Sequence, residues 1–217
     1  TADGSGRQDV VAFVALEALP AGTSLSFTDR GWNGSAFFEA TARESVVTYT
    51  ASTEIPAGPV VLLGSNSNTG NSFSEFGALD GDWLDLNEGG DQVLAFTGTA
   101  ESPTFIAGVH AFLDFDYDPT TGWNTGQTVS ANHSGLPSGL VPGRSALALF
   151  SLGDTFPANA QYTGPNEGTP QRLRESIHDP ENWTFSADRV YPTGGYPGVA
   201  EFTVREPVPS LEVQPAI

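Results

Sequence analysis

The fold is decided by residues 10–29, which read VVAFVALEALPAGTSLSFTD. The run from Val10 to Leu16 is apolar throughout, and apolar residues alternate with polar ones from Ser24 to Asp29. Short apolar runs and a period of two residues both predict β-strands, since successive side chains of a strand point to opposite faces of the sheet. Between them lies Leu19-Pro20-Ala21-Gly22, in which proline presets φ for a turn and glycine completes it. The stretch therefore predicts two strands joined by a turn.

The same pattern recurs along the chain. It predicts further strands at Val46–Thr50, Val60–Gly64, Gln92–Thr97, Thr104–Leu113, Ala146–Ser151 and Glu201–Val204, and a strand in the NWTF segment at Trp183. The 25 glycines and 16 prolines indicate many tight turns and few long helices. Strands and turns at this spacing predict an all-β protein, a sandwich or a barrel.

One helix is predicted, Gln171–His178, because Thr169-Pro170 is a helix start signal and Pro180 stops it. Leu173 and Ile177 share one face of this helix and are expected to pack it onto the sheet. Two stretches rich in glycine, serine and asparagine, Gly64–Ser74 and Gly122–Gly139, are predicted to be exposed, mobile loops.

The charge excludes some classes of function. Eight basic residues, all arginine, stand against 26 acidic ones, for a net charge of −18. Phosphate backbones and anionic lipid would repel such a chain, so we expect no nucleic-acid partner. No apolar run is long enough for a membrane-spanning helix, so we expect no membrane insertion. The absence of both cysteine and methionine excludes thiol chemistry and fits an extracellular or cell-surface location.

Several segments carry a resemblance to a known family. They are VAFVALEALPAGTSLSFTDRGWNG (11–34), IPAGPVVLLG (55–64), LDLNEGGDQVLAF (84–96) and PTFIAGVHAF (103–112), with later pieces such as GLVPGRSALAL and RESIHDPENWTFS. Together they resemble the lamin-tail-like modules of secreted bacterial proteins. The resemblance implies an immunoglobulin-like β-sandwich, here with one short helix and an extended C-terminal strand. It implies no family-wide active site.

The chain departs from that family at its start. The modules open with an apolar strand ahead of the one equivalent to Val10–Leu16, whereas residues 1–9 here are all polar or small. Loss of that strand would leave an apolar groove exposed. We therefore expect a β-sandwich domain over residues 1–205 with a groove that another strand fills.

The tail, residues 206–217, is a candidate for that strand. After an extended connector containing Pro207 and Pro209, the residues Leu211, Val213, Pro215 and Ile217 alternate with Glu212, Gln214 and Ala216. The tail could fold back into its own domain, or the chain could simply be cut from a larger protein at this point. Alternatively, the tail could enter the groove of the next subunit in a head-to-tail contact that propagates into a filament. Pro215 cannot donate to a sheet, so pairing must end there at an edge or a bulge.

Two acidic groups are candidate calcium sites. The first is Asp114, Asp116 and Asp118, whose spacing by two residues brings oxygens together in a calcium loop. The second lies in a turn-rich segment and comprises Asp80, Asp82 and Asp85, with Glu88 and Asp91 nearby. The first group departs from the helix-loop-helix calcium pattern, because Pro119 stands where that pattern requires glycine. For both groups, a solvated acidic surface is the competing interpretation.

Aromatic residues suggest one further site. Trp123, between Gly122 and Asn124 in a loop, is the best candidate for an exposed face that stacks on carbohydrate, whereas Trp32 and Trp183 are expected to be core residues. No nucleophile elbow, zinc motif or phosphate-binding loop occurs in the sequence.

These observations together predict a secreted, non-enzymatic structural protein. It would be a subunit of an extracellular filament or surface assembly joined by donor-strand exchange of the tail. The alternative is a calcium-dependent or carbohydrate-binding module of a larger secreted enzyme or adhesin.

Overall fold

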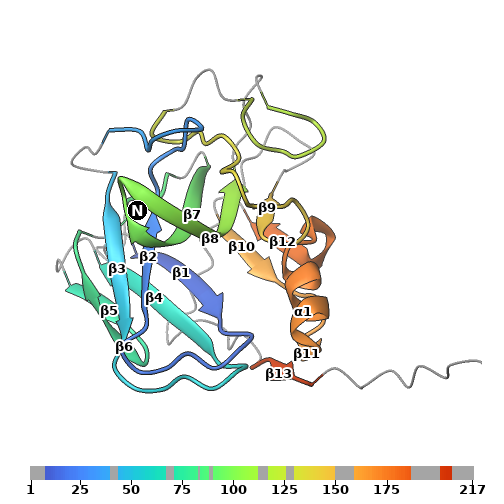
Figure 1. Ribbon diagram of the computed structural model, residues 1–217. Helices are drawn as coiled ribbons and strands as arrows, with labels where there is room; N and C mark the ends of the chain where they lie inside the picture. Colours follow the sequence, from blue (N-terminus) through green and yellow to red (C-terminus); the bar gives the residue numbers. More distant parts are fainter. Residues whose placement is uncertain are drawn as a thin grey trace, which may run out of the picture.

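A computed structural model describes residues 8–39, 44–66, 71–82, 84–87, 90–111, 117–125, 130–149, 159–186 and 201–206. Within these ranges the protein is all-β with one α-helix, as predicted, and its two larger sheets face each other as a sandwich (Figure 1). No helix in these ranges is long and apolar enough to cross a membrane.

The larger sheet has six strands in the order β6-β3-β2-β7-β8-β9. The strands are β6 (Gly77–Asp80), β3 (Val46–Ala51), β2 (Ser24–Thr28), β7 (Asp91–Thr99), β8 (Ser102–Ala111) and β9 (Ala146–Ala148). Neighbours are antiparallel except β8 and β9, which are parallel. The smaller sheet has the antiparallel order β1-β4-β5, formed by β1 (Gln8–Val14), β4 (Val60–Asn66) and β5 (Asn71–Ser74).

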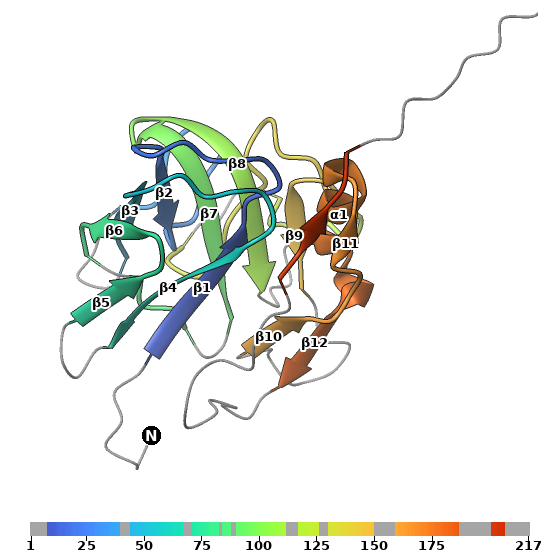
Figure 2. The ribbon, with the colours of Figure 1, turned by 90° about the horizontal axis from the view of Figure 1, so that it is seen from below.

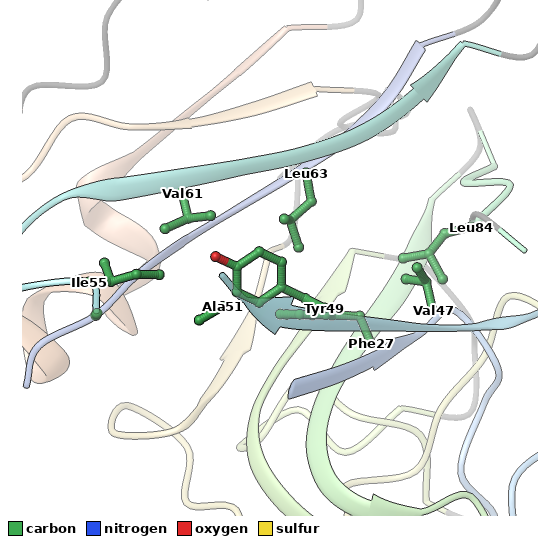
Figure 3. Packing of buried hydrophobic residues seen from close by; sticks show 9 residues of the cluster. Phe27, Val47, Tyr49, Ala51, Ile55, Val61, Leu63 and Leu84 are labelled. Atoms are coloured by element: carbon green, nitrogen blue, oxygen red, sulfur yellow. The ribbon is translucent and has the colours of Figure 1, made fainter. Parts of the chain in front are cut away.

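The main core lies between these sheets. Tyr49 and Val47 of β3 are fully buried. In Figure 3 the Tyr49 ring points toward Val61 and Leu63 of β4 in the facing sheet, and Val47 lies beside Leu84. Phe27, Ala51 and Ile55 are also labelled in that view, and Ala15 belongs to the same buried cluster. Because alternate residues of each strand supply this core, the period of two in the sequence is the direct cause of the layered fold.

A second core covers the other face of the six-stranded sheet. Leu94 and Phe96 of β7 point away from the main core, whereas Val93 and Ala95 pack against it. Loop residues Trp32, Phe37, Trp123 and Leu140 close over Leu94 and Phe96. The prediction that Gly122–Gly139 is an exposed loop is therefore wrong for most of its described residues, while Thr125, Ser138 and Gly139 are exposed. Loops that carry large aromatic side chains bury them instead of leaving them in water.

Residues 159–186 and 201–206 form a smaller unit beside the sandwich (Figure 2). It contains the antiparallel pair β10 (Asn159–Tyr162) and β12 (Trp183–Ser186), and the parallel pair β11 (Glu167–Gly168) and β13 (Thr203–Val204). It also contains helix α1 (Pro170–Ile177) and a short 3₁₀ turn η1 (Pro180–Asn182).

Helix α1 begins as the sequence predicts. Its N-cap is Thr169, whose hydroxyl accepts a hydrogen bond from the Arg172 amide, and Pro170 occupies the first turn. Leu173 is buried as expected. The helix packs on β11 and η1, however, whereas its apolar face was expected to cover the main sheet.

Candidate functional site

The two sheets of the sandwich differ in width, with six strands in one and three in the other. The smaller sheet therefore leaves part of the inner face of the larger sheet less well covered. Phe27 of β2 and Tyr49 of β3 face the main core and are 3% and 0% exposed. On the neighbouring β7, Val93 and Ala95 face the same core but are only half-buried. Their direct partners on β8, Val109 and Ala107, are also half-buried.

Strand β1 forms the opposite side of this region. Its residues Val11 and Phe13 pair with Leu63 and Val61 of β4 and therefore face the same core. The Phe13 ring centroid lies 5.8 Å from that of Phe27 and 5.5 Å from that of Tyr49, yet both Val11 and Phe13 remain half-buried. We refer to these six residues, Val11, Phe13, Val93, Ala95, Ala107 and Val109, as the open strip.

Strand β1 is also an edge strand. Within the described residues it pairs with β4 alone, over seven residues in an unbroken register. The other three edge strands of the two larger sheets, β5, β6 and β9, have four, four and three residues. Proteins usually protect sheet edges by short strands, charged side chains, proline or bulges. Strand β1 has no proline and no bulge, and its one charged residue, Asp9, lies near its start. The open strip and the β1 edge together are suited to accept an added strand.

A second notable feature is a cluster of buried carboxyl groups at the ends of the strands. Asp29 follows β2, Glu44 precedes β3 and Asp91 begins β7, and the three are 0%, 4% and 8% exposed. Burial, with a smaller contribution from the neighbouring carboxylates, raises the pKa of Glu44 and of Asp91 to about 8. Burial likewise raises the pKa of Asp29. We refer to these three residues as the carboxyl cluster.

The cluster is tied to the main chain of the surrounding loops. Asp29 Oδ1 accepts a hydrogen bond from the Ser45 amide and Oδ2 from the Asp85 amide, both at 2.9 Å. Asp91 Oδ2 accepts from the Asn87 amide at 2.9 Å, and Oδ1 from the Gln92 amide at 2.8 Å. The carboxyl groups therefore hold the loops before β3 and β7 against the end of β2.

The predicted calcium ligands do not come together as one site among the described residues. Asp80 and Asp82 are exposed, while the main-chain amide of half-buried Asp85 binds Asp29. Asp118 Oδ1 accepts from the Thr120 hydroxyl at 2.6 Å and the Thr120 amide at 2.8 Å, and these bonds lower its pKa. Asp114 and Asp116 lie outside the described residues. No three His, Cys, Asp or Glu side chains in the described part are arranged to share a metal ion.

Trp123 is not the exposed residue that the sequence suggests. Its side chain is fully buried in the second core and stacks on His110 with 5.1 Å between ring centroids. Trp32 is buried as expected. Trp183 is half-buried, and its indole N–H donates to the carbonyl oxygen of Ile177 at 2.8 Å. The prediction that Trp123 is an exposed stacking platform for carbohydrate is therefore wrong.

The tail residues Leu211, Val213, Pro215 and Ile217 lie outside the described residues. Glu206 is the last described position before them. No protein-family model, curated protein or solved structure matches this chain. The resemblance to lamin-tail-like modules stays a prediction.

Sequence reasoning missed the carboxyl cluster. Its members are distant along the chain and their neighbours follow no metal-binding or catalytic pattern. One weak signal exists: Asp29 falls in step with Leu25 and Phe27 in the alternation of β2, which places a carboxyl group on the inward face. The same alternation places Asp91 in step with Val93 and Ala95 of β7. For Glu44 no comparable signal is present.

Proposed function

We propose that this chain is a non-enzymatic structural protein of the cell exterior that joins to further copies of itself by strand addition. The acceptor is the β1 edge with the open strip, and the donor is the tail segment Ser210–Ile217. Each copy has one acceptor and one donor, so repeated contacts of this kind produce a filament.

The observation that carries the proposal is the combination of a long unprotected edge with a half-covered apolar surface beside it. Val11 and Phe13 on β1, and Val93 on β7, already pack on the core but keep part of their surface in water. A strand hydrogen-bonded to β1 would widen the smaller sheet and cover these side chains. Main-chain bonds would then supply affinity and alternate side chains would supply specificity.

The tail has the composition that such an acceptor requires. If the segment is extended, its alternation would put Leu211, Val213, Pro215 and Ile217 on one side and Glu212 and Gln214 on the other. The apolar side suits the open strip and the polar side suits solvent. The eight residues of the segment are close in length to the seven of β1.

The direction in which the chain leaves β13 favours insertion of the tail into a second copy over insertion into its own domain. Strand β13 starts beside the turn between β3 and β4, and in both Figure 1 and Figure 2 it points away from β1. Four residues, Glu206 to Pro209, connect its neighbourhood to the donor segment, and Pro207 and Pro209 favour an extended chain. Four extended residues span at most about 14 Å, which leaves little length for a reversal toward β1.

The decisive experiment removes the donor. Deletion of Ser210–Ile217 should abolish filaments in negative-stain electron microscopy and leave a folded monomer in size-exclusion chromatography. A synthetic peptide with the sequence of residues 210–217, added to the deleted protein, should bind and raise its melting temperature. The matched control is the double variant Glu212→Thr, Gln214→Thr, which changes only the solvent side of the tail and should still assemble. Filaments that survive the deletion would overturn the proposal.

A calcium-dependent or carbohydrate-binding module remains the alternative prediction from sequence. No contact among the described residues favours it.

A further inference from the structure

The free edge of β1 carries a definite pattern of main-chain groups, which follows from the contacts of the neighbouring strand. Leu62 of β4 directs both of its main-chain groups toward the side of β5. Its carbonyl oxygen accepts from the Glu75 amide, and its N–H donates to Glu75 Oε2, each at 3.2 Å. In an antiparallel sheet, the N–H and C=O of one residue point to one side and those of the next residue point to the other. The main-chain groups of Val61 and Leu63 are therefore directed to β1.

The register of β1 extends this pattern to the free edge. Phe13 lies opposite Val61, and Val11 lies opposite Leu63. The N–H and C=O of Phe13 and Val11 are therefore directed to β4. The residues that alternate with them direct these groups to the free edge, and they are Val10, Ala12 and Val14. Within the described ranges, no strand pairs with β1 on that side.

The side chains of these edge residues lie on the outer face of the smaller sheet. Val11 and Phe13 pack against the main core, so the side chains that alternate with them point the opposite way. Ala12 is exposed, and Val10 and Val14 are half-buried. Along β1, the residues with a free main chain are therefore those whose side chains face away from the open strip.

An added tail that runs antiparallel to β1 is compatible with Pro215. This step rests on the proposed function, in which the apolar side of the tail covers the open strip. In an antiparallel pair, the residues that exchange hydrogen bonds lie directly opposite each other and carry their side chains on the same face. The tail residues that bond to β1 would then be those of the outer face, Glu212, Gln214 and Ala216. The nitrogen of Pro215, which carries no hydrogen, would point away from β1, and no bond to β1 would be lost.

A parallel tail is not compatible with Pro215. In a parallel pair, each residue bonds to the two residues that flank the one opposite it, so the bonding residues of the two strands face opposite sides of the sheet. The apolar side of the tail, which includes Pro215, would then have to bond to β1. Its nitrogen cannot donate, and its ring would occupy the place of the missing hydrogen bond.

We propose that the tail of one copy adds to β1 of the next copy in the antiparallel direction, with Pro215 directed to the far edge of the added strand. At that edge the missing N–H interrupts the row of donors that a further strand would need. Proline at an edge is one of the devices by which proteins prevent edge-to-edge pairing. The tail therefore extends the smaller sheet by one strand and opposes the addition of another.

Engineered disulfides test the direction of the tail, because the chain contains no cysteine of its own. In the full-length protein, Val10→Cys or Val14→Cys on β1 is combined with one cysteine at Glu212, Gln214 or Ala216 on the tail. Covalent ladders on non-reducing gels report which pairs lie side by side. In the antiparallel arrangement, the preferred partner of Val14→Cys should lie nearer the start of the tail than that of Val10→Cys, whatever the register. The opposite order would overturn the proposal.

Proline and alanine substitutions in the tail provide a second test. Gln214→Pro removes an N–H that an antiparallel tail donates to β1, so the critical concentration for assembly should rise about tenfold or more. Gln214→Thr is the matched control and should assemble like the wild type. Assembly of Gln214→Pro at the wild-type concentration would contradict the antiparallel direction.

Pro215→Ala restores an N–H at the far edge of the added strand. This variant should assemble at the wild-type concentration, and its filaments should join sideways into bundles in salt that screens the acidic surface. Filaments that stay single under these conditions would overturn the role of Pro215 at the edge.

The outcomes separate this inference from the proposed function. If the wild-type protein forms no filaments in negative-stain electron microscopy, the proposed function fails and the inference fails with it. If filaments form but the disulfides show the opposite order, only the antiparallel direction is overturned.

Discussion

The amide nitrogen of Phe202 donates to the carbonyl oxygen of Gly58 over 2.9 Å. The amide of the same glycine donates to the carbonyl oxygen of Ala15, just beyond the end of β1, also over 2.9 Å. One residue in the turn before β4 therefore joins the start of the sandwich to the segment that leads into β13. The Phe202 ring is buried and stacks on Tyr162, which anchors the smaller unit at this point. The position from which the tail leaves the protein depends on this contact.

Replacement of Gly58 should release that anchor. Gly58 has a φ of +114°, and a β-carbon there would collide with the carbonyl oxygen of Phe202. We expect Gly58→Ala to destabilise the protein by about 1–3 kcal/mol, measured by urea denaturation. Gly22→Ala is the control, since Gly22 also has a positive φ of +84° but has open space around its α-carbon. Equal losses in the two variants would show that the Phe202 contact contributes nothing.

A charge in the open strip should prevent assembly without unfolding the monomer. Ala107 is a half-buried residue of the open strip on β8, so Ala107→Asp would place a carboxylate against the apolar side of an incoming strand. We expect filaments to be lost in electron microscopy while the circular dichroism spectrum is unchanged.

The neighbouring Ile106 provides the control for this variant. A register shift between β7 and β8 leaves it unpaired, and it is 45% exposed. Ile106→Asp should assemble like the wild type. Assembly of Ala107→Asp at wild-type levels would place the acceptor elsewhere.

Trp123→Ala should act on stability and not on ligand binding. The side chain is fully buried, and a β-carbon on Gly108 would lie only 2.9 Å from its ring, so the packing around it is tight. Truncation of a large buried aromatic residue costs about 3–5 kcal/mol, measurable by chemical denaturation. Tyr117→Ala, at an aromatic residue that is 37% exposed, should cost much less. A stable Trp123→Ala protein that has lost glycan binding would restore the carbohydrate hypothesis.

A variant of Asp118 distinguishes the predicted calcium-binding role of this residue from a turn-forming role. Its carboxylate already binds the amide and hydroxyl of Thr120, so Asp118→Ala should lower the melting temperature by the same amount in calcium and in chelator. If Asp118 is a calcium ligand, calcium should instead raise the melting temperature of the wild type by more than that of the variant. Differential scanning fluorimetry in the two buffers distinguishes these outcomes.

The strands were predictable from the sequence because they depend on local chemistry. Alternation at Ser24–Thr28 and the apolar run of β1 specify extended chain whose side chains have one buried face, and Pro-Gly pairs specify the turns. Helix α1 was equally clear from Thr169 and Pro170. Strands β5, β6, β10 and β11 were missed because they are short and because glycine, asparagine and polar residues give them little periodicity.

The candidate sites depend on contacts between distant segments. The sequence predicted a missing strand, and therefore an apolar groove, beside β1. Only the difference in width between the sheets showed which residues line the opposite side of that groove: Val93, Ala95, Ala107 and Val109. The carboxyl cluster brings Asp29, Glu44 and Asp91 together from the ends of three strands, and desolvation by the surrounding loops determines their pKa values.

By itself, the sequence determined the layered all-β architecture, the position of the helix and the apolar alternation of the tail. These follow from interactions between residues near one another in the chain. Tertiary structure alone decided which side chains were removed from water: Trp123 from a glycine-rich loop became part of a core, and among the described residues the acids Asp29, Glu44 and Asp91 became buried. Burial is a property of the assembled sheets, and no residue type or spacing within one segment specifies it.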